Sequence, residues 1–155
     1  MIRTLGLALL AVWQGAVACP PPATDSSRLA ISGGSITEIV YLLNESSKIV
    51  AADRTSNYPT AATKLPSIGY VRNLSAEGVL SIEPTLILAE NDTGPPIVLN
   101  QLRKTGVEIA IIPEQMDAEG IISKVECVAS VINADPESTA TATAKLAQNL
   151  AVLEH

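Results

Sequence analysis

Short apolar runs alternate with longer segments of helical periodicity from residue 28 to the end of the chain. Four of the runs are short, rich in Ile, Val, Leu and Ala, and predict buried strands. They cover residues 28–32, 48–53, 85–90 and 107–114. The segments with apolar residues at helical spacing are 35–45, 75–82, 96–106, 117–135 and 136–155. Strands that alternate with helices in this way need crossover connections. The pattern therefore predicts an α/β fold, a Rossmann-like lobe with a parallel four-stranded sheet flanked by helices.

Polar residues at the helix starts predict where two helices begin. Ser35 is placed to cap the helix at 35–45, and Glu38 three residues later completes a capping-box pattern. Ser75 is placed to cap the helix at 75–82 in the same way.

The helix predicted at 117–135 contains both an apolar stripe and a cysteine. The stripe consists of Ile121, Val125, Val128 and Ile132. Cys127 lies in the same apolar pattern and is predicted to be a small core residue rather than a ligand or nucleophile. The other cysteine, Cys19, is too distant in sequence for the two to suggest a metal site, and a disulfide between them stays open.

The N-terminus has the pattern of a secretory signal over residues 1–18. It combines the basic Arg3, an apolar run and the small-residue ending Ala16-Val17-Ala18, and it is too short for a permanent membrane span. A buried N-terminal helix is the alternative. Residues 19–27 then form a proline-rich leader, predicted to be stiff and unstructured. Lipid attachment at Cys19 also stays open, although a larger aliphatic residue is usual where Ala16 stands.

Length and charge limit the possible functions. A chain of 155 residues with 47% hydrophobic residues has room for the core of one ordinary domain. Its formal net charge of -6 has the wrong sign for neutralising phosphates, so we expect no nucleic-acid partner.

Catalytic constellations are weak in this sequence. Gly33 and Gly34, followed by Asp53, match part of a dinucleotide-binding fingerprint, but the further glycines of that turn are missing. The sole histidine, His155, is the last residue, where a triad member is rarely held in place. Glu83 and Glu90 flank a predicted strand rather than converge, so acid–base catalysis has no good candidate. We predict a non-enzymatic protein.

One tyrosine lies where ligands bind in this class of fold. The carboxyl ends of parallel strands form the binding edge of a sheet, and "GYVR" at 69–72 follows the second predicted strand. Arg72 would favour the phenolate form of Tyr70 if the two approach. A phenolate is a hard anionic donor suited to ferric iron, and tyrosine is a known axial ligand of haem. A surface or packing role is the alternative for a tyrosine in a turn.

The chain after the signal resembles the N-terminal lobe of periplasmic haem-binding proteins, the solute-binding subunits of bacterial haem ABC importers. The resemblance runs through "ISGGSITEIVYLL", "IVAADRTSNYP", "LPSIGYVRNLSAEGVLSIEPTLILAE" and "GPPIVLNQLRKTGVEIAIIPE" in order. It implies a periplasmic protein that binds haem and delivers it to an inner-membrane permease. The related cobalamin- and siderophore-binding proteins share the framework, so those ligands stay open.

The resemblance also implies roles for individual residues. Tyr70 matches the axial ligand of the haem iron, and Arg72 matches a partner of the phenolate or of a haem propionate. Glu77 matches a carboxylate that forms a salt bridge with the permease, although it also suits the first turn of a helix by itself. Further residues are expected to line the haem face: Gly34, Ser35, Tyr58, Thr93 and Gly94.

The sequence departs from the haem-binding family in extent. Family members have two lobes joined by a long helix; here residues 28–135 match the first lobe and 136–155 match the start of that helix. A second lobe is absent from the sequence, so a truncated, non-transporting fragment is a further alternative. One lobe buries only part of a haem, and its exposed interlobe face favours self-association. We therefore expect weak haem binding, or binding by a dimer.

Overall fold

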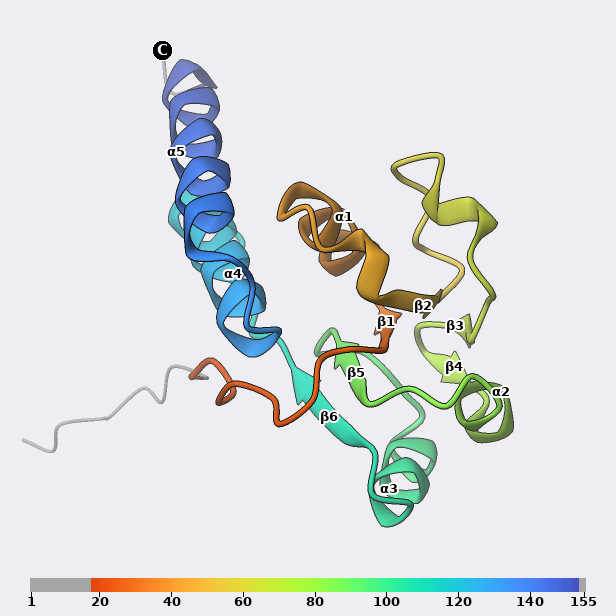
Figure 1. Cartoon of the computed structure of the whole chain (residues 1–155). Helices are drawn as coiled ribbons and strands as arrows, with labels where there is room; N and C mark the ends of the chain where they lie inside the picture. The colour runs from red at the N-terminus through yellow and green to blue at the C-terminus, as the bar shows by residue number, and fades with distance from the viewer. Residues whose placement is uncertain (1–17, 154–155) are drawn as a thin grey trace, which may run out of the picture.

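The computed structural model describes residues 18–153, which form an α/β lobe around a parallel sheet (Figure 1). The four-stranded sheet has the order β2-β1-β5-β6, and every neighbouring pair is parallel. Its strands are β1 (Leu29–Ser32), β2 (Ile49–Ala52), β5 (Leu86–Ala89) and β6 (Glu108–Ile111). The predicted fold class is therefore confirmed. Except for Ala18, the predicted signal sequence lies outside the described residues.

Helices cover both faces of the sheet. On one face, α1 (Gly34–Leu42) and α4 (Ala118–Val131) pack against the strands, and α5 (Pro136–Leu153) packs against α4 (Figure 1). On the other face lie α2 (Ala76–Leu80) and α3 (Pro96–Lys104). Short 3-10 turns occur at Ser46–Lys48 and Ala62–Lys64. No helix within residues 18–153 combines the length and apolar character that a membrane crossing requires.

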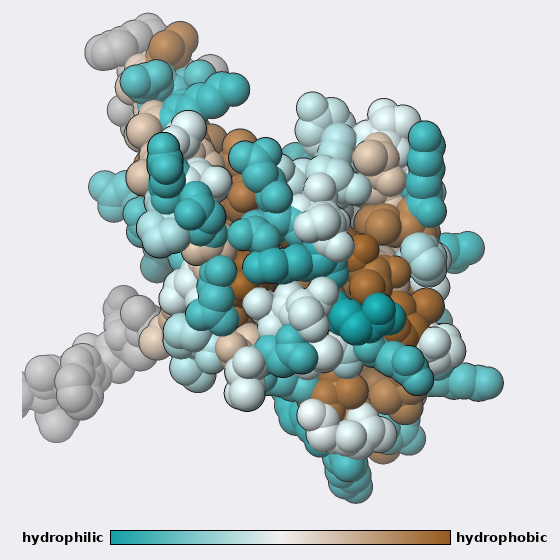
Figure 2. Space-filling view, in the orientation of Figure 1, coloured by the Kyte–Doolittle hydropathy of each residue, from teal (hydrophilic) through white to brown (hydrophobic). Residues whose placement is uncertain are grey.

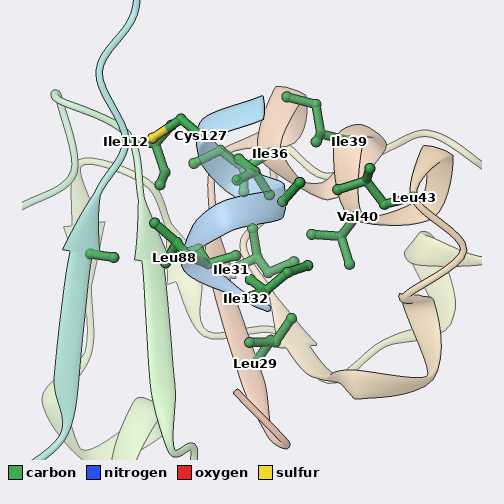
Figure 3. Close-up of a cluster of buried hydrophobic side chains, with 14 of the residues drawn as sticks. Leu29, Ile31, Ile36, Ile39, Val40, Leu43, Leu88, Ile112, Cys127 and Ile132 are labelled. Atoms are coloured by element: carbon green, nitrogen blue, oxygen red, sulfur yellow. The ribbon is translucent and has the colours of Figure 1, made fainter. Parts of the chain in front are cut away.

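Successive side chains along the strands point to opposite faces of the sheet and are buried in two separate hydrophobic cores. Leu29 and Ile31 of β1 point toward α1 and α4, where Ile36, Val40 and Ile132 meet them (Figure 3). Ala30 of the same strand belongs to the opposite core with α2 and α3. A strand buried on both faces reads as a continuous apolar run, which is why the sequence showed no alternation there.

Most predicted element boundaries agree with the structure to within a few residues, but only one of the two caps does. Ser75 Oγ accepts a hydrogen bond from Gly78 N at 3.1 Å and caps α2 as expected. The predicted capping box of Ser35 and Glu38 is wrong, because α1 begins at Gly34 and its N-cap is Gly33. The Ser35 hydroxyl instead donates to Glu90 Oε1 at 2.6 Å. This long-range partner replaces the local one.

The stripe predicted for α4 is correct in three of its four members. Val125, Val128 and Ile132 are buried, whereas Ile121 is 44% exposed. Ile121 lies near the start of the helix, at the edge of a surface groove described below.

The proline-rich leader is ordered in the structure, contrary to the prediction for residues 19–27. Ala23 is buried in the main core, and its N–H donates to the carbonyl of Val131 at 2.9 Å. Cys19 forms a disulfide with Cys127 across a sequence separation of 108 residues. Cys127 is thus a core residue, as predicted, but not a free thiol. The leader is joined covalently to α4.

Candidate functional site

A small hairpin at the carboxyl edge of the sheet carries Tyr70. Strands β3 (Gly69–Tyr70) and β4 (Asn73–Leu74) are two residues each and pair antiparallel. Val71 and Leu74 are buried beneath the hairpin, while Tyr70 is 43% exposed. The buried residues fix the hairpin and leave the tyrosine ring at the surface.

Backbone hydrogen bonds fasten the hairpin to two neighbouring loops. Arg54 N donates to Gly69 O at 2.8 Å, which joins the hairpin to the loop after β2. Gly94 N donates to Val71 O, and Gly94 O accepts from Leu74 N, both at 2.9 Å. Gly69 has φ +107°, a conformation that glycine adopts without strain. Tyr70 is therefore held on a braced loop.

Arg72 interacts with Asp92 as well as with Tyr70. Its Nε donates to Asp92 Oδ2 at 2.8 Å, in an ion pair that is largely exposed. The hydrogen bond and the charge of Asp92 raise the pKa of Arg72 above its usual value, and Tyr70 adds a smaller electrostatic contribution in the same direction. The guanidinium is close enough to Tyr70 to interact electrostatically, but its hydrogen bond goes to Asp92.

Asp53 organises the turn at the start of α1. It is 4% exposed, and its Oδ1 accepts from Gly33 N at 3.0 Å and from Ser56 Oγ at 3.1 Å. Its Oδ2 accepts from Thr55 N at 2.9 Å. The two glycines thus serve a tight strand-to-helix turn, and Asp53 is used to fix the loop that leads to Tyr58.

Lys124 of α4 forms a second polar cluster at the same edge. Its Nζ donates to Ser35 Oγ at 2.6 Å and to Glu114 Oε1 at 2.8 Å, and it lies 3.6 Å from Glu90 Oε1. Lys124 is 6% exposed, and Asp53 is the other buried charged side chain within residues 18–153. Glu90 and Glu114, two carboxylates from different loops, thus meet at Lys124.

Replacing Lys124 is expected to destabilise the lobe. Lys124→Met would leave Glu90 and Glu114 facing each other without a cation, at a cost of roughly 3 kcal/mol, the low end for a broken buried pair. The cost stays at the low end because the side chains of Glu90 and Glu114 are 20% and 33% exposed. Thermal unfolding measures it. The matched control is Lys145→Met on α5, an exposed lysine, and equal melting temperatures for the two variants would contradict this role.

A groove of about 810 Å³ lies between α1 and the pair formed by α4 and α5. Figure 2 shows apolar surface in this hollow with hydrophilic side chains around it. Its apolar wall includes Ile39, Leu42, Met116, Ile121 and Leu146. Ser35 and Tyr58 also line it, whereas Tyr70 does not. A second cavity, of about 250 Å³, lies beside it and shares Glu114 and Lys124.

The residues predicted to form the site fall into separate groups. Tyr70, Arg72 and Gly94 belong to the hairpin and the loop that braces it. Ser35 and Tyr58 line the groove. Thr93 is 7% exposed, and its hydroxyl lies 3.1 Å from Ser32 Oγ, so it supports the edge from beneath. Glu77 is exposed in the first turn of α2 and belongs neither to the hairpin group nor to the groove group.

Gly34 has no room for a side chain, although Gly94 does. An added Cβ at Gly34 would lie 2.8 Å from the backbone O of Thr55, whereas one at Gly94 would have nothing nearer than 3.7 Å. We expect Gly34→Ala to push the Thr55 loop away and to cost roughly 1–3 kcal/mol, as overpacking does. Gly94→Ala is the control and is expected to cost less. A melting temperature for Gly34→Ala at or above that of the control would contradict the expectation.

The sequence did not identify three residues of this edge as members of the site: Asp92, Glu114 and Lys124. Lys124 had a usable signal, because it lies three residues after Ile121 and four before Val128, on the same helical face as the apolar stripe. A lone cation on such a face suggests a buried partner. Asp92 and Glu114 follow strands β5 and β6, and their partners depend on the tertiary fold.

Comparisons with known proteins identify the family of this chain. The sequence matches the model for "Periplasmic binding protein" over residues 29–149, and the chain belongs to this family. Its members are binding proteins rather than enzymes. Between residues 18 and 153, no group of three or more His, Cys, Asp or Glu side chains is arranged to hold a metal ion.

The similar proteins are named for two different ligands, heme and vitamin B12. A periplasmic heme-binding protein from Pseudomonas aeruginosa is 35% identical with a TM-score of 0.75, covering 80% of this chain and 44% of that one. The heme-binding protein RhuT from Roseiflexus is 34% identical with a TM-score of 0.76, covering 82% and 48%. The vitamin B12-binding protein of Vibrio cholerae is 30% identical over 109 residues, covering 70% and 38%. The chain thus spans half or less of the length of these relatives.

Proposed function

We propose that this chain is the haem-binding N-terminal lobe of a periplasmic solute-binding protein, with Tyr70 as the axial ligand of ferric iron. The observation that carries the proposal is the exposed ring of Tyr70 on a braced hairpin at the carboxyl edge of the sheet. The edge of a parallel sheet is where ligands bind in open α/β folds. The identity to proteins named for haem supports this ligand.

Arg72 and Asp92 have a supporting role in this proposal. The Arg72 side chain is exposed enough to turn toward an anionic group of the ligand. Ser35 and Tyr58 line the groove, and Gly94 braces the hairpin. Together with Gly34 and Thr93, they are the further residues that we propose for the haem face.

Titration of hemin into the purified chain tests the proposal. Binding should give the absorption spectrum of ferric haem with an oxygen ligand and should quench tyrosine fluorescence. Tyrosine serves as the reporter because the only tryptophan, Trp13, lies in the predicted signal sequence. Absence of saturable binding would leave the third alternative, a non-transporting fragment.

Cobalamin is the second candidate ligand, because the curated relatives of this chain are named for vitamin B12. Competition between hemin and cobalamin for the chain distinguishes the two. The proposal requires hemin to displace cobalamin at comparable concentrations, and the reverse order would assign the lobe to a corrinoid. A ferric siderophore is a third competitor in the same assay.

The partner of the proposed function is an inner-membrane ABC permease. Glu77 is exposed in the first turn of α2, where a carboxylate can meet a basic group of a docking protein. The proposed compartment is the periplasm, supported by the predicted signal sequence and by the family. Crosslinking of the chain to its permease, weakened by Glu77→Gln, would support this docking role.

The groove between α1 and α4 bears on the oligomeric state. Leu42, Tyr58, Met116 and Ile121 are all exposed around it, so a second copy that covered them would bury apolar surface. A single lobe also contacts one side of a flat ligand at most. We therefore propose that hemin binds weakly to the monomer or more tightly to a dimer, which sedimentation with and without hemin distinguishes.

A further inference from the structure

The sulfur of Cys19 can bond to only one further group, so a lipid and a disulfide partner exclude each other. It can join a lipid through a thioether, or it can join a second cysteine. In the structure it is bonded to Cys127 of α4. We propose that the mature protein carries Cys19 in this disulfide and is therefore not lipid-anchored at that residue. This inference does not depend on which ligand the lobe binds.

The segment after Cys19 is held in a way that brings the two cysteines together. We call residues 19–28 the N-terminal strap. Ala23 N donates to Val131 O at 2.9 Å, and Asn133 Nδ2 donates to Ala23 O at 3.2 Å. Ser26 Oγ donates to Ile132 O at 2.7 Å. Each bond ties the strap to the C-terminal end of α4 or to the turn that follows it.

The strap also contributes to the core and to the sheet. Ala23 is 5% exposed among the side chains that α1 and α4 bury, and Thr24 N donates to Glu108 Oε2 of β6 at 3.1 Å. These contacts fix the strap independently of the disulfide. Cys19 is consequently delivered to one place on α4, with its Cα 5.6 Å from that of Cys127, within the usual range for a disulfide.

The two cysteines differ in solvent exposure. Cys127 is 6% exposed and faces the core side of α4, whereas Cys19 is exposed at the surface. If Cys19 carried a lipid, Cys127 would remain a buried thiol and the strap would not be cross-linked to α4. Because the strap holds Cys19 next to Cys127, it favours oxidation of the two thiols to a disulfide.

Formation of the disulfide requires an oxidant. The thiols of Cys19 and Cys127 lose two protons and two electrons as the S–S bond forms. We assign the oxidant to the class of thiol–disulfide oxidoreductases, whose own disulfide accepts the electrons and protons and becomes a dithiol. Such disulfides form and persist in oxidising compartments, including the bacterial periplasm.

Intact mass spectrometry of the full chain, expressed with its own N-terminus in a Gram-negative host, tests the inference. We expect the processed protein to remain in the aqueous phase after detergent phase separation. Its mass should rise by two hydrogens on reduction, and a thiol-alkylating reagent should label both cysteines only after reduction. A wild-type protein that bears an acylglyceryl mass and enters the detergent phase would overturn the inference.

Cys127→Ser provides the matched control. This variant should leave Cys19 as a free thiol that takes up one alkyl group without reduction. A Cys19 that stays unlabelled and without lipid in the variant would mean that its partner is not Cys127, which would also contradict the inference. If the variant does not accumulate, the mass and labelling of the wild-type protein decide the question alone.

Discussion

Tyr70→Phe should abolish the oxygen-ligated spectrum of ferric haem and weaken hemin binding by more than about 100-fold. Loss of a group that only supports a metal ligand commonly costs 10- to 100-fold in affinity, and loss of the ligand itself should exceed that. Phenylalanine keeps the ring and removes only the oxygen, so the braced hairpin should be preserved. Parallel titrations of the two proteins, followed by absorbance, measure the change.

Tyr41→Phe is the matched control for this substitution. Tyr41 is a half-buried tyrosine of α1 that lines the groove and is remote in sequence from the hairpin, so its loss of an oxygen should leave the oxygen-ligated spectrum unchanged. If Tyr70→Phe binds hemin as the wild type does, then another group holds the iron. Equal melting temperatures for the two variants would ensure that a difference in binding is not a difference in folding.

Removal of the disulfide should be the largest single loss of stability in the lobe. The bond closes a loop over a sequence separation of 108 residues, and loop-entropy arguments give about 4.7 kcal/mol for a loop of about 100 residues. We expect Cys19→Ser to lower the free energy of unfolding by about 4 kcal/mol and the melting temperature by roughly 10 °C. Denaturant unfolding of the oxidised wild type and the variant measures this.

Two comparisons separate the cross-link from other effects of the substitution. The reduced wild type should unfold close to the Cys19→Ser variant, because both lack the bond. Addition of reductant should then change the variant little. A wild type whose stability is unaffected by reduction would contradict the assignment of this stability to the disulfide.

The sheet and its helices followed from the sequence because their signals are local. Each strand is a short apolar run, and each long helix has apolar residues at helical spacing, so periodicity alone located them. Parallel pairing followed from the alternation of the two. The cap of α2 was also predictable, since Ser75 and its partner Gly78 are three residues apart.

Features that depend on contacts distant in sequence were not predictable. Strands β3 and β4 have two residues each, too few to show a period, so the hairpin of Tyr70 read only as a turn. The pairing of Cys19 with Cys127 spans most of the chain. Ser35 looked like a local cap because its true partner, Glu90, lies 55 residues away.

The candidate site was predictable in part for the same reason. The glycine turn and the position of Tyr70 at the edge of the sheet followed from the order of the elements. The pairing of Arg72 with Asp92 did not, because the loop after β5 had to be brought to the hairpin by the fold. The cluster around Lys124 likewise joins three segments that no local pattern links.

Resonance Raman spectroscopy of the ferric haem complex decides whether Tyr70 binds the iron, because it detects the bond between iron and a phenolate oxygen. We expect an iron–phenolate vibration in the wild type and in Tyr41→Phe, shifted when the tyrosine is isotopically labelled and lost in Tyr70→Phe. A wild-type complex without that vibration, or a Tyr70→Phe complex that keeps it, would contradict the claim.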